Sequence, residues 1–210
     1  MGKALIAVVV LIVIVGLIGV ACFGAYVSTK NTLVQKNEGV KSAWSQVDVV
    51  LQRRADLIPN LVETVKGYAK QEQTVFGDIA KARSALLSAG TPQQKIAANG
   101  QLDGALGRLL LVVENYPQLK SNENFLRLQD ELAGTENRIS VERKRYNDTL
   151  QDYNTYVQQF PNSVFAGWAG FKANDAYFQA SEGSRAVPNV NFSSPSTSSP
   201  QTSPQPAPTR

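Results

Sequence analysis

The chain has 210 residues, no histidine and one cysteine, and its formal net charge is +4. Without histidine, Ser-His-Asp triads, Cys-His pairs, histidine-containing zinc sites and the di-iron sites of helical bundles cannot be built. One cysteine excludes a disulfide within the chain, and interspersed charges are typical of an ordinary soluble surface rather than a nucleic-acid-binding face. No phosphate-binding or dinucleotide-binding glycine motif is present, so we expect no cofactor, no metal, no nucleic acid and no enzymatic activity.

An uncharged apolar run, 4–27, lies between Lys3 and Lys30. A helix needs about 20 apolar residues to cross the hydrocarbon core of a bilayer, so this run is long enough. We therefore predict that the first domain, 1–28, is a transmembrane anchor. Two cleaved alternatives remain: an ordinary secretory signal peptide, and a lipoprotein signal in which a lipobox-like sequence directs lipidation of Cys22.

Amphipathic helices follow the anchor. Apolar residues at alternating spacings of three and four predict helices over 29–55 and 57–89. Pro59 falls between the two stripes, and proline is well tolerated only in a first helical turn because it lacks an amide proton. We therefore predict a helix break at about residue 56, with Asp56 capping the next helix. A kinked continuous helix is the alternative.

Two further helices complete the prediction. Gly90, Thr91 and Pro92 combine a helix C-terminus with an N-cap and a proline at the first helical position. The third helix should run from there to about Tyr116, where Pro117 stops it, and the fourth from 121–124 to about 160. Short connections require antiparallel neighbours. The domain 29–192 is therefore predicted to be all-α, an elongated antiparallel four-helix bundle.

The C-terminal part of the chain changes composition twice. Residues 163–192 are rich in glycine and aromatic residues, and we predict a partly helical strap that packs back on the bundle; an exposed partner-binding segment is the alternative. In 193–210 serine, proline and threonine dominate. Such a composition cannot bury enough apolar surface to offset chain entropy, so this tail is predicted to be disordered.

Three blocks of the sequence closely resemble the LemA family of bacterial membrane proteins. The matching positions are 44, 47–49, 51–54, 56–62 and 65–69, then 114–120, 124–125 and 128–129, and finally 134–139, 145–147 and 153–154. The resemblance covers roughly 26–192, and motifs of this length and order are highly specific. It implies a long antiparallel helical bundle behind an N-terminal membrane segment, and it implies no reaction.

The sequence gives only weak evidence of the side of the membrane on which the helical domain lies. Lysines follow the apolar run at positions 30, 36 and 41, and counting them favours a cytoplasmic domain. Long domains nevertheless translocate despite such charge, and a signal-anchor commonly exports the domain behind it. We predict a single-pass protein of the bacterial cell membrane with an extracytoplasmic domain. Ala21 and Ala25 would suit a homo-oligomer, although small-xxx-small pairs are common in apolar helices.

Polar residues beside the apolar stripes are the candidate site. They are Arg53, Arg54, Asp56, Asn60, Glu63, Glu136, Asn137 and Arg138. In one interpretation they form a structural network of paired charges that fixes helix register; in the other they dock a protein partner or a small ligand. Glu142, beside the fourth stripe, indicates a polar layer, and 143–145 is expected to be a solvated face.

The favoured hypothesis is a membrane-anchored, non-enzymatic scaffold or adaptor that acts through protein partners at the cell envelope. An accessory regulator of a membrane protease or transporter is the first alternative. A carboxylate-based envelope hydrolase is the second, although nothing in the sequence places two acids together at a pocket.

Overall fold

The computed structural model describes residues 2–179, without the side chains of Lys3 and Ala4. Its elements are α1 (Gly2–Lys66), α2 (Gln73–Ser88), α3 (Pro92–Val113), α4 (Pro117–Lys120), α5 (Glu123–Gln158) and α6 (Asn162–Ala169). An extended segment, 171–179, follows α6. The all-α class is confirmed. The second part of the predicted strap, 180–192, and the predicted tail, 193–210, lie outside the described residues.

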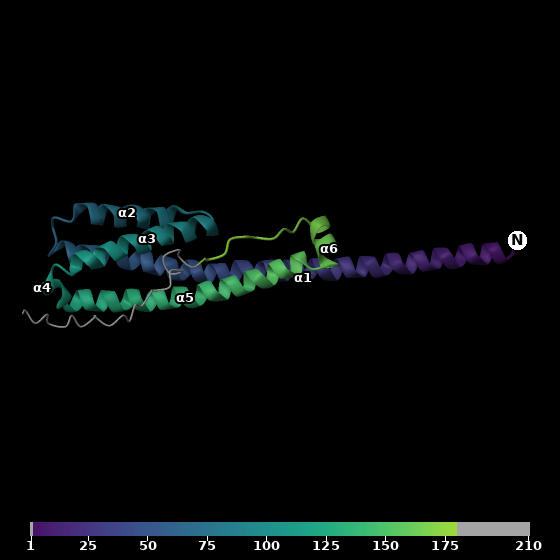
Figure 1. The fold of residues 1–210 in the computed structure, drawn as a ribbon. Coiled ribbons are helices and arrows are strands. Elements are labelled where there is room, and N and C mark those ends of the chain that lie inside the picture. Colours follow the sequence, from purple (N-terminus) through teal and green to yellow (C-terminus); the bar gives the residue numbers. More distant parts are fainter. Residues whose placement is uncertain (1, 180–210) are drawn as a thin grey trace, which may run out of the picture. The chain divides into compact units, whose positions relative to one another are not determined.

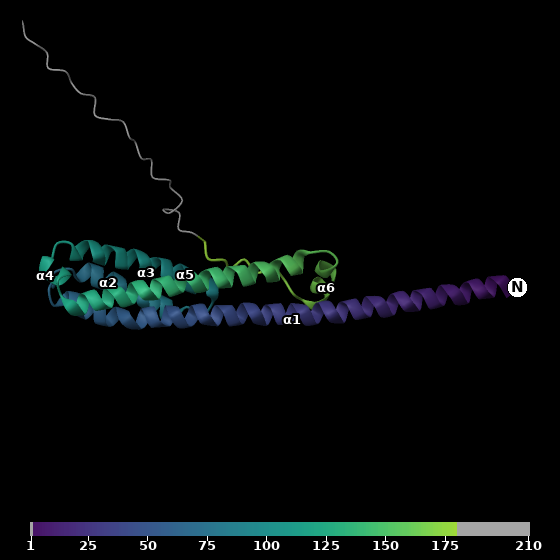
Figure 2. The same cartoon turned by 90° about the horizontal axis from the view of Figure 1, so that it is seen from below.

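Two helix pairs form most of the described part of the chain (Figures 1 and 2). α5 runs antiparallel to α1, and α2 and α3 form a hairpin that packs on the C-terminal half of α1. The α2–α3 hairpin lies along only part of the α1–α5 pair, because its helices have 16 and 22 residues whereas α1 has 65 and α5 has 36. α6 contacts α1 and α5 at the other end of α5.

The N-terminal part of α1 packs against no described element. Its apolar side chains from Leu5 to Phe23 are exposed, and the helix is long and apolar enough there to be a candidate membrane span. Burial begins at Thr29 and Leu33, just beyond the contact between the rings of Tyr26 and Phe165. Up to Tyr26, the predicted anchor therefore coincides with the part of α1 that packs against no other described element.

The predicted helix break at about residue 56 is wrong. α1 continues through Pro59, so Asp56 is not an N-cap; its side chain accepts a hydrogen bond from Gln52 at 3.0 Å. Because proline has no amide proton, it leaves the carbonyl of Ala55, four residues earlier, without its helical donor. Arg83 of α2 replaces that donor, since its Nε donates to the Ala55 oxygen at 2.7 Å. A neighbouring helix thus supports proline inside α1.

The corner lies instead at 67–72, so the predicted helix 57–89 is divided between α1 and α2. Gly67 is a poor helix former, and the amides of Tyr68 and Ala69 both donate to the Val65 carbonyl, at 3.0 and 2.9 Å. These bonds close α1 in a tight turn. Asn122 then donates to the Tyr68 hydroxyl at 3.0 Å, which ties this corner to the start of α5.

The locally encoded boundaries agree better with the prediction. Thr91 forms a capping box with Gln94: its hydroxyl accepts from the Gln94 amide at 3.3 Å, and the Gln94 side chain accepts from the Thr91 amide at 3.2 Å. Asn122 caps α5 by accepting from the Phe125 amide at 3.0 Å. α3 ends at Val113, earlier than predicted, and Pro117 opens α4 instead of stopping α3.

We expect Arg83→Met to lower the free energy of unfolding by about 1–2 kcal/mol, because the buried Ala55 carbonyl would lose its donor. Urea titration in detergent, followed by circular dichroism, measures this loss. In a Pro59→Ala background the restored helical amide satisfies Ala55, so the same Arg83 substitution should cost less than about 0.5 kcal/mol. Equal losses in the two backgrounds would contradict this account of Pro59.

Candidate functional site

A cluster of charged and polar side chains joins α1, α3 and α5. Nη1 of Arg54, whose side chain is 9% exposed, lies 2.5 Å from Asp103 and 2.9 Å from Glu136. The same nitrogen donates to the Asn99 side chain at 3.2 Å, and Asn99 donates to Asp103 at 3.0 Å. Arg143 lies 3.9 Å from each of the two carboxylates. These five residues, the polar cluster, balance two arginines against two acids.

Helical spacing brings these side chains to one place. Arg54 takes a position on the buried face of α1, between Leu51 and Ile58. Asn99 and Asp103 are one turn apart on α3, and Glu136 and Arg143 are two turns apart on α5, so each pair shares a helix face. The polar cluster therefore forms only when all three helices are correctly aligned.

We expect the polar cluster to set the register of the helices more than it adds stability. Removing an arginine from water is costly, and pairing it with carboxylates offsets that cost only when the geometry is good. Two further contacts reach the same stretch of α1: Lys95 of α3 pairs with Asp48, and Arg83 of α2 binds the Ala55 carbonyl. Together they fix the α2–α3 hairpin on α1.

An apolar cavity of about 240 Å³ adjoins the polar cluster. Arg54 and Glu136 lie at its wall, and its main apolar lining residues are Leu61, Leu106, Leu109, Leu110, Phe125 and Leu132. Sites for small molecules usually enclose about 300–1,000 Å³. Asp103 is not part of the lining, so the two carboxylates that the fold brings together do not both face this space. The arrangement does not favour the hydrolase hypothesis.

The structure divides the predicted site residues into two groups. Arg54 and Glu136 belong to the polar cluster. The others are exposed: Arg53, Asp56, Asn60 and Glu63 on α1, and Asn137 and Arg138 on α5. Within the exposed group, Glu63 pairs with Lys66 at 2.8 Å. Cys22, the lipidation site in the lipoprotein alternative, is exposed in the apolar part of α1. Docking through the exposed group stays a prediction.

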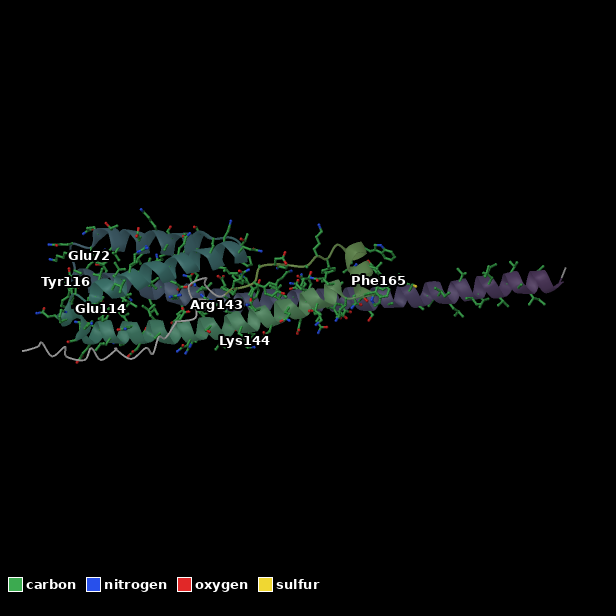
Figure 3. The ribbon with its side chains drawn as sticks, viewed as in Figure 1. Glu72, Glu114, Tyr116, Arg143, Lys144 and Phe165 are labelled. Atoms are coloured by element: carbon green, nitrogen blue, oxygen red, sulfur yellow. The ribbon has the colours of Figure 1, made fainter. Side chains whose placement is uncertain are left out.

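Three members of the polar cluster were not predicted. Asn99 and Asp103 share the face of α3 that also buries Ala98 and Leu102, a pattern visible in the sequence. The prediction of a solvated face is wrong for Arg143, whose guanidinium lies 5.0 Å from the centre of the Phe178 ring. The reason is that the segment after α6 returns to α5 and covers this side chain. Figure 3 shows Arg143 on α5 beneath that segment.

Two asparagines of α5 hold the extended segment 171–179. Asn147 donates to the Phe178 carbonyl at 2.9 Å and accepts from its amide at 3.0 Å. Asn154 makes the same pair of bonds to Asn174, at 2.7 and 2.8 Å, and also donates to the Tyr177 hydroxyl at 2.8 Å. Each side-chain amide thus replaces a peptide group of a neighbouring strand. The described part of the predicted strap does pack back on the helices.

Aromatic rings close the strap against the α1–α5 pair. The Phe178 ring stacks on Trp44 at 6.0 Å and meets the edge of Tyr146 at 6.0 Å. Burial raises the pKa of Tyr146, and the nearby Tyr177 adds a smaller electrostatic contribution. Burial also raises the pKa of Tyr153, whose hydroxyl donates to the Lys172 carbonyl at 2.9 Å. Among residues 2–179, the Tyr146 hydroxyl has no hydrogen-bond partner.

A family model described as the LemA family matches residues 43–192, a range that contains the polar cluster and the strap. The chain is 28% identical over 175 residues to the magnetosome protein MamQ 2 of Paramagnetospirillum magneticum, covering 71% of this chain and 64% of that protein. It is 26% identical over 172 residues to the protein LemA of Metamycoplasma hominis, covering 79% and 75%. The chain thus spans slightly less than two thirds of the first of these relatives. Neither is named for an enzymatic activity.

Replacing Arg54 alone should be costly. Arg54→Met leaves the two carboxylates with only the more distant Arg143, 3.9 Å from each, and we expect a loss of about 2–3 kcal/mol in the free energy of unfolding. This figure lies below the full penalty for breaking a buried pair, since both acids keep some exposure to water. Urea denaturation is the measurement. The adjacent, exposed Arg53→Ala serves as control and should change stability by less than about 0.5 kcal/mol.

Adding Asp103→Asn and Glu136→Gln to the Arg54→Met variant removes the two acids that Arg54 no longer neutralises. This should recover part of the loss, because Arg143, the charge that then remains, is 25% exposed to water. If the triple variant is less stable than the single variant, charge pairing is not what the polar cluster contributes.

Tyr146→Phe should leave stability at neutral pH unchanged or raise it by up to about 1 kcal/mol, because the variant removes a buried hydroxyl without a partner. In the wild type, the raised pKa means that the folded chain keeps this proton while the unfolded chain releases it above pH 10.0. Stability therefore falls as the pH rises past that value. The variant should lose stability less steeply there, in urea titrations across alkaline pH. If the stability of the variant and of the wild type falls equally steeply with rising pH, Tyr146 is not the source of the alkaline pH dependence.

Proposed function

This chain belongs to the LemA family, and we propose that it is a non-enzymatic helical scaffold that acts through protein partners at the cell envelope. The N-terminal part of α1 holds it in the membrane as a single-pass anchor. One observation carries the proposal: α1 continues from the candidate membrane span into an exposed row of polar residues, Arg53, Asp56, Asn60 and Glu63. We call this row the polar stripe.

The polar stripe has the geometry of a docking face. Its residues are spaced by three and four positions, so their side chains project from one side of α1. The opposite side of the helix is buried in the core, at Leu51, Ile58 and Leu61 among others. The stripe combines a cation, two acids and an amide, which suits recognition of a polar protein surface better than insertion into lipid.

The continuity of α1 gives the stripe a defined position. At about 1.5 Å per residue, Asn60 lies roughly 50 Å along the helix from Tyr26, where the apolar part of α1 ends. A partner bound to the stripe would therefore be held at a fixed distance from the membrane. This is a positioning role, and it needs no reactive side chain. Asn137 and Arg138 of α5 are further exposed candidates beside Glu136.

We place the stripe outside the cytoplasm, because a domain that follows an N-terminal signal-anchor is commonly exported. Cross-linked partners of extracytoplasmic location would agree with this placement, and cytoplasmic partners would contradict it.

A photo-reactive amino acid at Asn60 of the full-length protein, expressed in its native membrane, tests the docking face. We expect one defined cross-linked partner. The double charge reversal Asp56→Lys and Glu63→Lys should abolish this product, whereas Lys81→Glu on exposed α2 should leave it intact. The polar stripe would be refuted as the docking face if the cross-linked product survived the double reversal. It would also be refuted if the same product formed equally well with the photo-reactive amino acid placed at position 81.

A further inference from the structure

The boundary of the membrane can be located on α1. The exposed apolar side chains begin at Leu5, and at about 1.5 Å per residue the helix from there to Tyr26 measures roughly 32 Å. The hydrocarbon core of a typical bilayer is about 30 Å thick. Tyr26 therefore falls at the level of the lipid headgroups when the apolar segment spans the bilayer, and Lys30 follows it by one turn.

α6 lies at that same level. The ring of Phe165 meets the edge of the Tyr26 ring at 6.2 Å, and Ala166 is buried. Figure 3 shows Phe165 on α6 where this helix lies against α1, whereas the labelled Tyr116 lies at the far end of the helices. Gly170 is left-handed, with φ of 80°, and ends α6. The chain then turns into the extended segment 171–179, which Asn147 and Asn154 fix on α5. The position of α6 is therefore set by contacts on both sides.

The outer side of α6 is unusually apolar. Trp168 is 74% exposed and Phe160, just before the helix, is 85% exposed. Val164, one turn before Trp168, is also exposed. Elsewhere in the described part of the chain, exposed large apolar residues beyond the membrane segment are aliphatic and scattered over α1, α2, α3 and α5, with Tyr68 the one exposed aromatic ring. The two most exposed aromatic side chains thus lie in α6 and directly before it, and Phe165 of this helix contacts both Tyr26 and Trp168.

We propose that α6 is a second membrane contact, with Phe160, Val164 and Trp168 inserted at the bilayer interface. Tryptophan and tyrosine concentrate at this level, because their rings combine an apolar body with a polar group that stays hydrated. Lipid is the occupant that this face fits, since Phe165 of the same helix contacts Tyr26, where the exposed apolar surface of the membrane span ends. α6 then fixes the angle at which α1 leaves the membrane.

The sequence offers a direct test, because it contains only two tryptophans, Trp44 and Trp168. In a Trp44→Phe variant of the full-length protein, reconstituted in phosphatidylcholine vesicles, Trp168 is the only reporter. We expect blue-shifted emission and the loss of most of the fluorescence in lipids brominated close to the headgroup. The matched control is Trp168→Phe, since Trp44 lies roughly 27 Å beyond Tyr26 along α1 and should not be quenched.

Each other outcome overturns the proposal. Blue-shifted emission without quenching by brominated lipid would mean that protein, from a second copy or another part of this chain, covers Trp168. Emission typical of water, with full quenching by acrylamide, would mean that α6 faces solvent.

A second measurement keeps Trp44 and its aromatic neighbours intact. A nitroxide at Val164→Cys, in a Cys22→Ala background, should collide more often with oxygen than with a water-soluble nickel complex. A nitroxide at Leu111→Cys, also exposed but on α3 near the far end, should show the reverse preference. A water-like preference at position 164 would refute insertion even if the Trp44→Phe variant folds poorly.

Discussion

A single guanidinium on the buried side of α1 constrains the arrangement of the helices. Arg54 cannot stay in the core without anionic partners, and those partners come from two other helices, Asp103 on α3 and Glu136 on α5. If the helices met only through apolar side chains, one helix could shift along another by a turn, since each leucine would then occupy the place of the next one. A charge with two fixed partners does not, so the polar cluster selects one register for α1, α3 and α5 together.

The second constraint is that α1 remains one helix. Pro59 removes a hydrogen bond from its interior, and Arg83 of α2 supplies the missing donor to Ala55. The α2–α3 hairpin is therefore held by Arg54 and, in turn, supports the helix that carries Arg54. Because α1 does not break, the same rigid element contains the candidate membrane span and the polar stripe. The proposed positioning role depends on that mutual support.

The range of each interaction explains how much of the structure the sequence predicted. The cap at Thr91 bonds to an amide three residues away and was predicted correctly, and the start of α5 falls within the predicted range 121–124, where Asn122 is the cap. Pro59 was misjudged because its compensation comes from Arg83, which is distant in sequence and approaches only after α2 folds back. Arg143 was misjudged for the same reason, since a solvated arginine and an arginine beneath the strap have identical local sequence. For the candidate site, spacing identified Arg54 and Glu136, whereas their partner Asp103 required the relative placement of α1 and α3.

The strap connects the internal constraints to the membrane. Asn147 and Asn154 fix residues 171–179 along α5, and the same chain carries α6 to Tyr26 at the end of the apolar segment. A domain on one membrane helix can tilt freely about its exit point. A second contact beside that point restricts the tilt, because two contacts define a line on the surface. With α6 inserted, the fixed distance between membrane and polar stripe becomes a fixed height above the bilayer, which is what a scaffold must provide to a partner.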